Sequence, residues 1–163
     1  MKKLALIFSA CCILSCGNDA EKPYQNINTE GTAPMGESQI VSALDENEIQ
    51  IDLKAGDDML YSTQEIRVQS GQKITLILKH VGKSHKNTMG HNFVLLQSGA
   101  DPAQFARTAS QFQERDFIPE DTSQIIVHTK LLSGGESDTL HFQAPAKGYY
   151  PFLCTFPGHV ASM

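Results

Sequence analysis

Short apolar runs separated by turn-forming residues are the feature that most limits how this chain can fold. From Glu48 onward, large apolar residues alternate with polar ones, as in the segments 49–53 and 74–78. A spacing of two places such side chains on one face of a β-strand, and Gly, Asp, Asn and Pro fall between the runs. The pattern predicts an all-β fold with about seven strands. The other runs expected as strands are 66–68, 93–96, 125–128, 140–142 and 149–153.

One segment departs from this pattern and predicts a short helix. Asp101 suits the N-cap position, and Pro102 suits the first helical position. The apolar residues that follow, Phe105, Ala109 and Phe112, have helical spacing. One short helix among many strands favours a Greek-key β-sandwich with a single helical flap.

The N-terminus has the pattern of a segment that directs export. Lys2 and Lys3 precede an apolar run at 4–14 that is too short to cross a bilayer, which is typical of a secretory signal. The following letters ILSCG resemble a bacterial lipobox, and this resemblance implies cleavage before Cys16 and lipidation of that residue. An ordinary secretory signal cut near Ala10 is the alternative.

These features predict three parts of the chain. Residues 1–15 form a lipoprotein-type signal peptide, and residues 16–47 form a lipidated Cys16 followed by a polar, flexible tether. Residues 48–163 form the folded domain. The lipid would hold the exported protein to the periplasmic side of a bacterial membrane. By resemblance, Gly17 after the lipid-bearing cysteine favours the outer membrane.

Charge and cysteine content narrow the possible partners. The formal net charge is -5, and no run of Lys or Arg occurs, so nucleic acid is not an expected partner. Cys11 and Cys12 would leave with the signal, and Cys16 would carry lipid. Cys154 is then the only thiol of the folded part, so it has no internal disulfide partner. A bound metal ion would protect it.

The C-terminal letters CTFPGHVASM carry a metal-binding pattern. Cys154, His159 and Met163 offer a thiolate, an imidazole and a thioether. This set suits copper, whereas zinc favours four strong ligands and has no use for a thioether. His91, at the start of a predicted strand, supplies a second imidazole. Two His, one Cys and a distant axial Met form a blue (type 1) copper site for electron transfer.

Three segments resemble the azurin family, within the cupredoxins. They are the letters CTFPGHVASM at 154–163, MGHNFVL at 89–95 and HTKL at 128–131. The resemblance covers about residues 49–163 and implies a cupredoxin-like sandwich for the predicted domain. It also implies one type 1 copper per chain.

The resemblance assigns roles around the copper. The carbonyl oxygen of Gly90 would be a weak axial contact opposite Met163. Asn92 would brace the ligand loop through hydrogen bonds, and the backbone N–H groups of Asn92 and Phe156 would point at the sulfur of Cys154. His80 would be buried without binding metal.

The resemblance also implies an apolar surface through which electrons pass. His159 would be the edge ligand, exposed in this surface. The residues expected in this partner patch are Met59, Met89, Phe156, Pro157 and Ala161. Its partner would be a redox protein such as a c-type cytochrome, docking weakly and briefly.

The chain departs from the azurin pattern in several places. Ile49 and Gln72 stand where a disulfide would be, and Phe93 replaces a buried Trp. The final strand that follows the axial Met in azurins is missing after Met163. Its loss would leave a sheet edge unpaired. We therefore expect the natural chain to continue for about 5–10 residues, the length of a strand.

The sequence thus predicts an electron carrier and not an enzyme, with no small-molecule substrate. One alternative is a copper-binding or buffering protein without an electron-transfer role, which needs affinity but no tuned redox couple. A second alternative is the cupredoxin domain of a copper oxidase or nitrite reductase. That class needs a second domain and His-x-His pairs, and this chain has none of these pairs.

Overall fold

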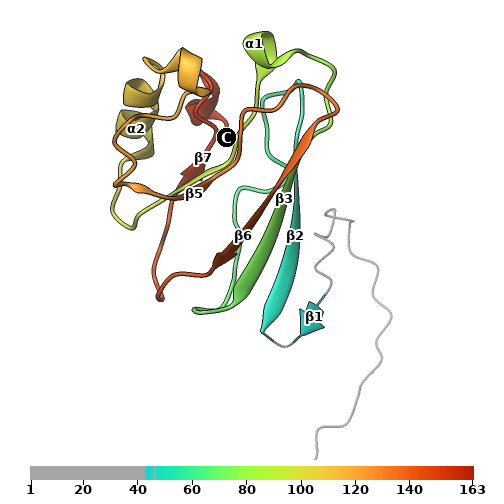
Figure 1. Ribbon diagram of the computed structural model, residues 1–163, viewed down its shortest axis with the longest axis vertical. Coiled ribbons are helices and arrows are strands. Elements are labelled where there is room, and N and C mark those ends of the chain that lie inside the picture. Colours follow the sequence, from blue (N-terminus) through green and yellow to red (C-terminus); the bar gives the residue numbers. More distant parts are fainter. Residues whose placement is uncertain (1–42, 46) are drawn as a thin grey trace, which may run out of the picture. The chain divides into compact units, whose positions relative to one another are not determined.

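The computed structural model describes residues 43–45 and 47–163, which form two β-sheets (Figure 1). The predictions for the signal peptide, for Cys16 and for most of the tether lie outside these residues. One sheet has the order β1-β2-β3-β6, formed by Ala43–Asp45, Glu48–Ala55, Lys73–His80 and Ser137–Gln143. The other has the order β5-β4-β7, formed by Ile125–His128, Val94–Leu96 and Phe152–Leu153. The predicted all-β sandwich is confirmed.

The four-stranded sheet is built on the alternation seen in the sequence. Strands β2 and β3 run parallel, from the pair Glu48 and Lys73 to the pair Ala55 and His80. Strand β6 pairs antiparallel with β3 on its other side. Every second residue of β2 and β3 is buried, because alternating side chains point to opposite faces of a sheet.

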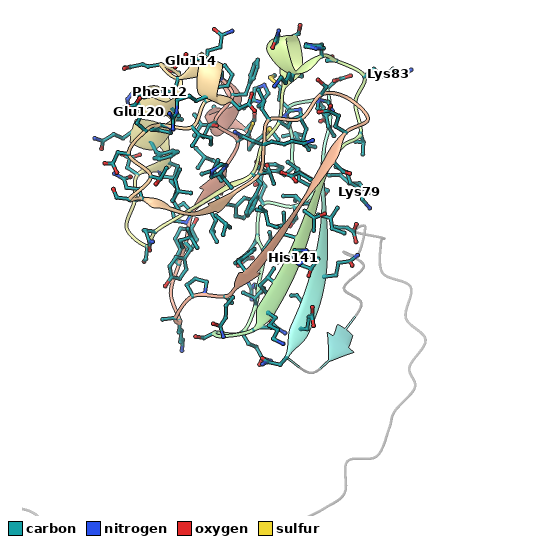
Figure 2. The ribbon with its side chains drawn as sticks, viewed as in Figure 1. Lys79, Lys83, Phe112, Glu114, Glu120 and His141 are labelled. Carbon is teal, nitrogen blue, oxygen red and sulfur yellow. The ribbon has the colours of Figure 1, made fainter. Side chains whose placement is uncertain are left out.

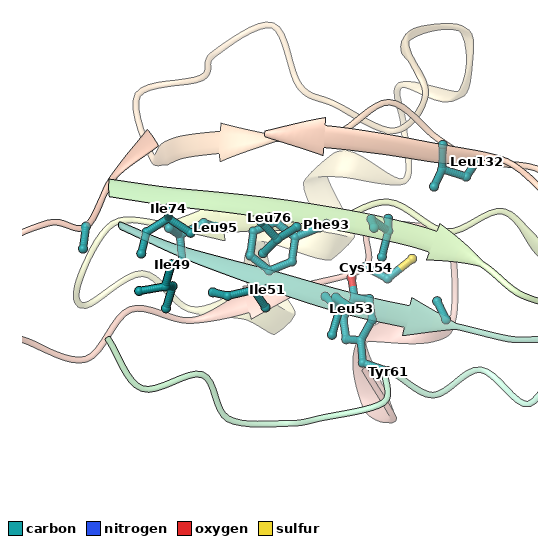
Figure 3. Packing of buried hydrophobic residues seen from close by; sticks show 13 residues of the cluster. Ile49, Ile51, Leu53, Tyr61, Ile74, Leu76, Phe93, Leu95, Leu132 and Cys154 are labelled. Atoms are coloured by element: carbon teal, nitrogen blue, oxygen red, sulfur yellow. The ribbon is translucent and has the colours of Figure 1, made fainter. Parts of the chain in front are cut away.

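The main core lies between the two sheets. It joins the inward-facing residues of β2 and β3 to Phe93 and Leu95 from the facing sheet (Figure 3). Leu53 and Leu78 in this cluster are fully buried. Cys154 belongs to the same cluster, and its sulfur lies at one end of it, beyond Leu53 in the view. The metal site is therefore built directly onto the core.

The predicted helical flap is α2, Pro102–Ala109. The side chain of Asp101 caps it by accepting two backbone N–H groups. Phe105 and Ala109 pack against Val94 and Leu96, which point away from the main core. The helix thus covers the outer face of the three-stranded sheet. Three short helical turns were not predicted: α1 at Lys86–Met89, η1 at Gln113–Arg115 and η2 at His159–Ala161.

Two strand predictions need correction. Segment 66–68 forms no strand, and its Val68 is exposed. In the connection between β2 and β3, only Tyr61 pairs with a strand, through an isolated bridge to Ala55. Strand β7 is shorter than the predicted 149–153, because Tyr149 projects into solvent with 81% of its surface exposed. Strand β1 falls within the segment predicted as tether, and it pairs with β2.

An open cavity of about 750 Å³ lies beside the main core. Strand β7 stands at the edge of its sheet and contributes to the wall of this cavity. The lining includes Phe93, Phe142, Tyr150, Phe152, Val160 and Met163. No helix in the described part of the chain is long and apolar enough to cross a membrane.

Candidate metal centre

Three predicted ligand residues converge at one end of the core. His91 follows α1 and makes an isolated bridge with Leu132, Cys154 directly follows β7, and His159 begins η2. All three are buried, and one ligand atom from each lies within 4.8 Å of the others. Residues 63 positions apart in the sequence are brought together because β4, which follows His91, pairs with β7, which precedes Cys154.

The spacing of the donor atoms fits a single metal ion. The Sγ atom of Cys154 lies 3.4 Å from Nδ1 of His159 and 3.9 Å from Nδ1 of His91. Donors bonded to one ion at distances of about 2.0–2.3 Å stand roughly 3.5–3.8 Å apart in trigonal or tetrahedral geometry. One thiolate and two imidazoles in a buried pocket are a donor set that copper favours.

The environment of Cys154 controls its charge. Burial raises the pKa of the thiol to about 11, while backbone N–H groups of Asn92 and Phe156 act in the opposite direction. These are the two groups that the resemblance placed at the sulfur. The carbonyl oxygen of Gly90 lies 3.8 Å from Sγ. A cation in the pocket favours the thiolate over the thiol, because its positive charge offsets the loss of solvation that burial causes.

Both imidazoles are neutral at pH 7. Burial lowers the pKa of His91. Burial also lowers the pKa of His159 to about 4, with repulsion from a protonated His91 as a smaller cause. The Nε2 atom of His91 lies 2.8 Å from the carbonyl oxygen of Gly56. Since a carbonyl only accepts, Nε2 carries the proton and Nδ1 faces Cys154 with a free lone pair. Neutral imidazole with a free nitrogen is the form that binds a metal.

Asn92 ties the first ligand segment to the ligand loop. Its Oδ1 accepts the N–H of Thr155 at 2.9 Å, and its Nδ2 donates to the hydroxyl of Thr155 at 2.7 Å. Both residues are fully buried. The two bonds hold the segments that carry His91 and Cys154 in fixed register, the geometry that the resemblance implied for Asn92.

His159 is buried rather than exposed as expected, with 2% of its surface accessible. The ring of Phe156 covers it at a centroid distance of 4.7 Å, and Phe117 packs edge-on against Phe156. The partner patch is itself only partly exposed. Met59, Pro157 and Ala161 are exposed, whereas Met89 and Phe156 are half-buried.

Met163 is attached to the site through its backbone. Its N–H donates to the carbonyl oxygen of His159 at 2.9 Å. Its half-buried side chain packs on the main core and lines the open cavity. Binding of copper by the Met163 sulfur stays a prediction.

Several groups around the site were not singled out in the sequence. The Gly56 carbonyl that binds His91 belongs to a segment predicted only as a loop. The buried phenol of Tyr61 donates its O–H to the carbonyl oxygen of Asn92.

His80 is buried as predicted, and the centroid of its ring lies 4.6 Å from that of His91. Among the described residues, every buried side-chain nitrogen or oxygen has a hydrogen-bond partner.

Known proteins of one family match most of the chain. The model for copper binding proteins of the plastocyanin/azurin family matches residues 47–163. Azurin-1 of Alcaligenes xylosoxydans xylosoxydans is 34% identical over 120 residues, which is 71% of this chain and 93% of that protein. Azurin of Pseudomonas aeruginosa is 36% identical over 120 residues, covering 71% of this chain and 81% of that protein. Outer membrane protein H.8 of Neisseria gonorrhoeae is 36% identical over 115 residues, 68% of this chain and 62% of that protein.

Solved structures agree with this match. Dithionite-reduced auracyanin from Roseiflexus castenholzii superposes with a TM-score of 0.62 at 37% identity, covering 69% of this chain and 88% of that chain. An azurin from Methylomonas sp. strain J gives a TM-score of 0.60 at 28% identity, covering 69% and 90%. The fold is that of the cupredoxins. This chain belongs to the plastocyanin/azurin family of copper-binding proteins, and its cofactor is copper.

Proposed function

We propose that this protein carries single electrons between redox proteins through one type 1 copper site. Its ligands are His91, Cys154 and His159, with the Met163 sulfur and the Gly90 carbonyl oxygen as weaker axial contacts. The observation that carries the proposal is the convergence of one buried sulfur and two imidazole Nδ1 atoms at the end of the core. Proteins of this family generally transfer electrons, which supports the assignment.

The surroundings of the ligands suit this role. Copper, when bound, supplies a one-electron couple between Cu(I) and Cu(II). The protein holds the ligands before the metal arrives: Gly56 fixes the ring of His91, and Asn92 fixes the loop that follows Cys154. Fixed, buried ligands need little rearrangement when the charge changes, and outer hydrogen bonds of this kind orient the ligating groups.

Electrons would pass through the partner patch beside His159. The ring of Phe156 lies tilted against that of His159, and its neighbours Pro157 and Ala161 are exposed. A small apolar surface of this kind suits brief docking of a partner, such as a c-type cytochrome. The chain would act as a carrier and not as an enzyme, because the proposed ligands leave no open position for a substrate.

The protein would work outside the cytoplasm, anchored by lipid on Cys16. The lipobox-like letters ILSCG support this location, as does the similarity to a protein named outer membrane protein H.8. Metabolic labelling with radioactive palmitate is expected to mark the wild type and to spare Cys16→Ser. Equal labelling of the two proteins would exclude the lipid anchor while leaving the copper site untouched.

One experiment tests the copper assignment. Cys16→Ser protein receives Cu(II), and its visible and EPR spectra are recorded. We expect an intense sulfur-to-copper charge-transfer band, which Cys154→Ser abolishes. A protein that binds copper without the band, or without a reversible reduction potential, would instead fit copper buffering.

A further variant tests the axial ligand. Met163→Ala should stay coloured, because His91, Cys154 and His159 remain. Its reduction potential should rise, since the thioether no longer reaches the metal. An unchanged potential, measured by voltammetry beside the wild type, would show that Met163 is not a ligand.

A further inference from the structure

The carbonyl oxygen of Gly56, which faces the His91 ring, belongs to a tight turn of the chain. It accepts the N–H of Met59 at 3.1 Å, which closes the turn Gly56–Met59, and it also accepts Nε2–H of His91 at 2.8 Å. Met59 adopts a left-handed conformation, with φ of 59°. The position of the His91 ring therefore depends on where this turn is held.

Asp57, inside the turn, reaches across to a distant loop. Its Oδ2 accepts the N–H of Lys83 at 2.9 Å, and its Oδ1 accepts the N–H of Ser84 at 3.3 Å. A second link lies beside them, since Val81 N–H donates to the carbonyl oxygen of Ala55 at 2.8 Å. The N–H of Lys83 is also the main cause that lowers the pKa of Asp57, so the carboxylate is charged at neutral pH.

The loop that receives Asp57 is itself fixed. The carbonyl oxygen of Ser84 accepts the N–H of Gly134 at 2.8 Å, and the hydroxyl of Ser133 accepts the N–H of Lys86 at 3.0 Å. A Cβ atom added to Gly82 would overlap Oδ1 of Asp57 and would lie 2.8 Å from Cε1 of His80. The contact is thus closely packed, and the loop can serve as a fixed support.

We propose that Asp57 is a positioning residue for the copper site. It docks the turn Gly56–Met59 onto the loop at 82–84, so that the Gly56 carbonyl accepts Nε2–H of His91 and Nδ1 stays directed at Cys154. This inference rests on the proposed function wherever its test measures copper binding, colour or reduction potential. The neighbouring Asp58 offers a matched control. Within the described residues, its carboxylate makes one hydrogen bond, a local one in which Oδ1 accepts the N–H of Leu60 at 3.3 Å.

The test compares Asp57→Ala, Asp57→Asn and Asp58→Ala in the Cys16→Ser background. Copper affinity is measured by competition with a chelator, and the visible spectrum and reduction potential are recorded. Imidazole ¹⁵N–¹H NMR of the metal-free protein reports whether His91 keeps its proton on Nε2. Loss of an outer hydrogen bond to a ligand typically lowers metal affinity by about 10- to 100-fold.

Asp57→Ala is expected to bind copper about 10-fold more weakly, at the lower end of that range. It should also shift the potential and place part of the His91 proton on Nδ1. Asp57→Asn keeps one acceptor oxygen and should fall between Asp57→Ala and the wild type. Asp58→Ala should keep the wild-type affinity and His91 tautomer. Because it removes a charge that acts on His91, as Asp57→Ala also does, its reduction potential measures the effect of charge loss alone.

Wild-type affinity, potential and His91 tautomer in Asp57→Ala would overturn the inference. If this variant fails to fold by circular dichroism, Asp57→Asn and Gly82→Ala replace it, and wild-type behaviour of both would overturn the inference equally. If the wild type itself shows no charge-transfer band, the proposed function fails. The NMR of the metal-free protein still decides in that case whether Asp57 fixes the His91 ring.

Discussion

The copper region and the cavity region of this protein are stabilised in different ways. The copper region, residues 55–59, 82–92 and 154–159, is joined by hydrogen bonds that cross between distant segments, such as those of Asn92 with Thr155. The cavity region, residues 64–70 and 145–152, borders a cavity of about 750 Å³. Its side chains Ile66, Tyr150 and Phe152 are only partly buried.

This contrast indicates that the copper region is held more rigidly than the cavity region. Hydrogen bonds are directional, so they fix the orientation of a ring or a loop, whereas apolar contacts fix only proximity. Met163 lies between the two regions, because its N–H donates to His159 while its side chain lines the cavity. We therefore expect Met163 to be the least restrained of the four proposed ligand residues.

The largest expected effect comes from removing copper. A ligand at about 1,000 times its Kd stabilises the folded state by about 4 kcal/mol, so copper-free protein should unfold at a lower temperature. Amide hydrogen exchange should accelerate mainly in the copper region, since the ligands join its segments. Equal acceleration at residues 64–70 would show that the two regions are not separately stabilised. Calorimetry and exchange mass spectrometry measure these effects.

A pair of leucines tests the packing contrast. Leu78 is fully buried in the main core, whereas Leu140 on β6 is half-buried. Leu78→Ala should lower the free energy of unfolding by about 2–5 kcal/mol, the range for buried leucines. Leu140→Ala should cost less than about 2 kcal/mol, because less apolar surface returns to water. Urea denaturation compares the two, and equal losses would contradict the contrast.

Tyr61→Phe tests one hydrogen bond beside the copper region. It removes the O–H donated to the Asn92 carbonyl oxygen and leaves that buried acceptor unpaired, at a cost of about 1–3 kcal/mol. Burial also raises the pKa of Tyr61 well above its usual value near 10. The folded state therefore retains this proton, and its stability is complete below pH 10 and falls as the pH rises further.

The measurement for Tyr61 is denaturant unfolding at neutral pH and at pH 11. The wild type should lose more stability between these two values than Tyr61→Phe does, because the variant has no phenol there to ionise. A phenol absorbance change near pH 10 in folded wild-type protein, assigned through the variant, would contradict the buried hydrogen bond.

The smallest effect is expected on the outer face, away from both regions. Lys79 lies on the outside of β3 and pairs with Asp52 at 2.6 Å (Figure 2). Lys79→Ala should cost less than about 1 kcal/mol, since exposed ion pairs contribute little and salt screens them. The hydrogen bond from Lys79 is the main cause that lowers the pKa of Asp52. The contribution should therefore be present above the unfolded pKa of this carboxyl and be lost as the pH falls through its folded pKa.

Strands, the flap helix and the ligand types could be predicted because they depend on local pattern. The alternation at 49–53 and 74–78 places β2 and β3, and Asp101 with Pro102 places α2. The prediction failed at 66–68, where apolar residues alternate without a neighbouring strand to pair with. Strand formation depends on the neighbouring strand with which a segment pairs, and the pattern of a single segment does not reveal that neighbour.

The sequence by itself determined the residue types that converge: one thiol and two imidazoles, carried by letters that identify the family. Tertiary structure alone decided how they are held. It covered His159 with Phe156, aimed the carbonyl of Gly56 at His91, and set Asp57 against a loop 26 residues away. The chemistry of each side chain follows from its residue type. Hydrogen bonds between distant loops, by contrast, form only after the two sheets have packed and set the distances between those loops.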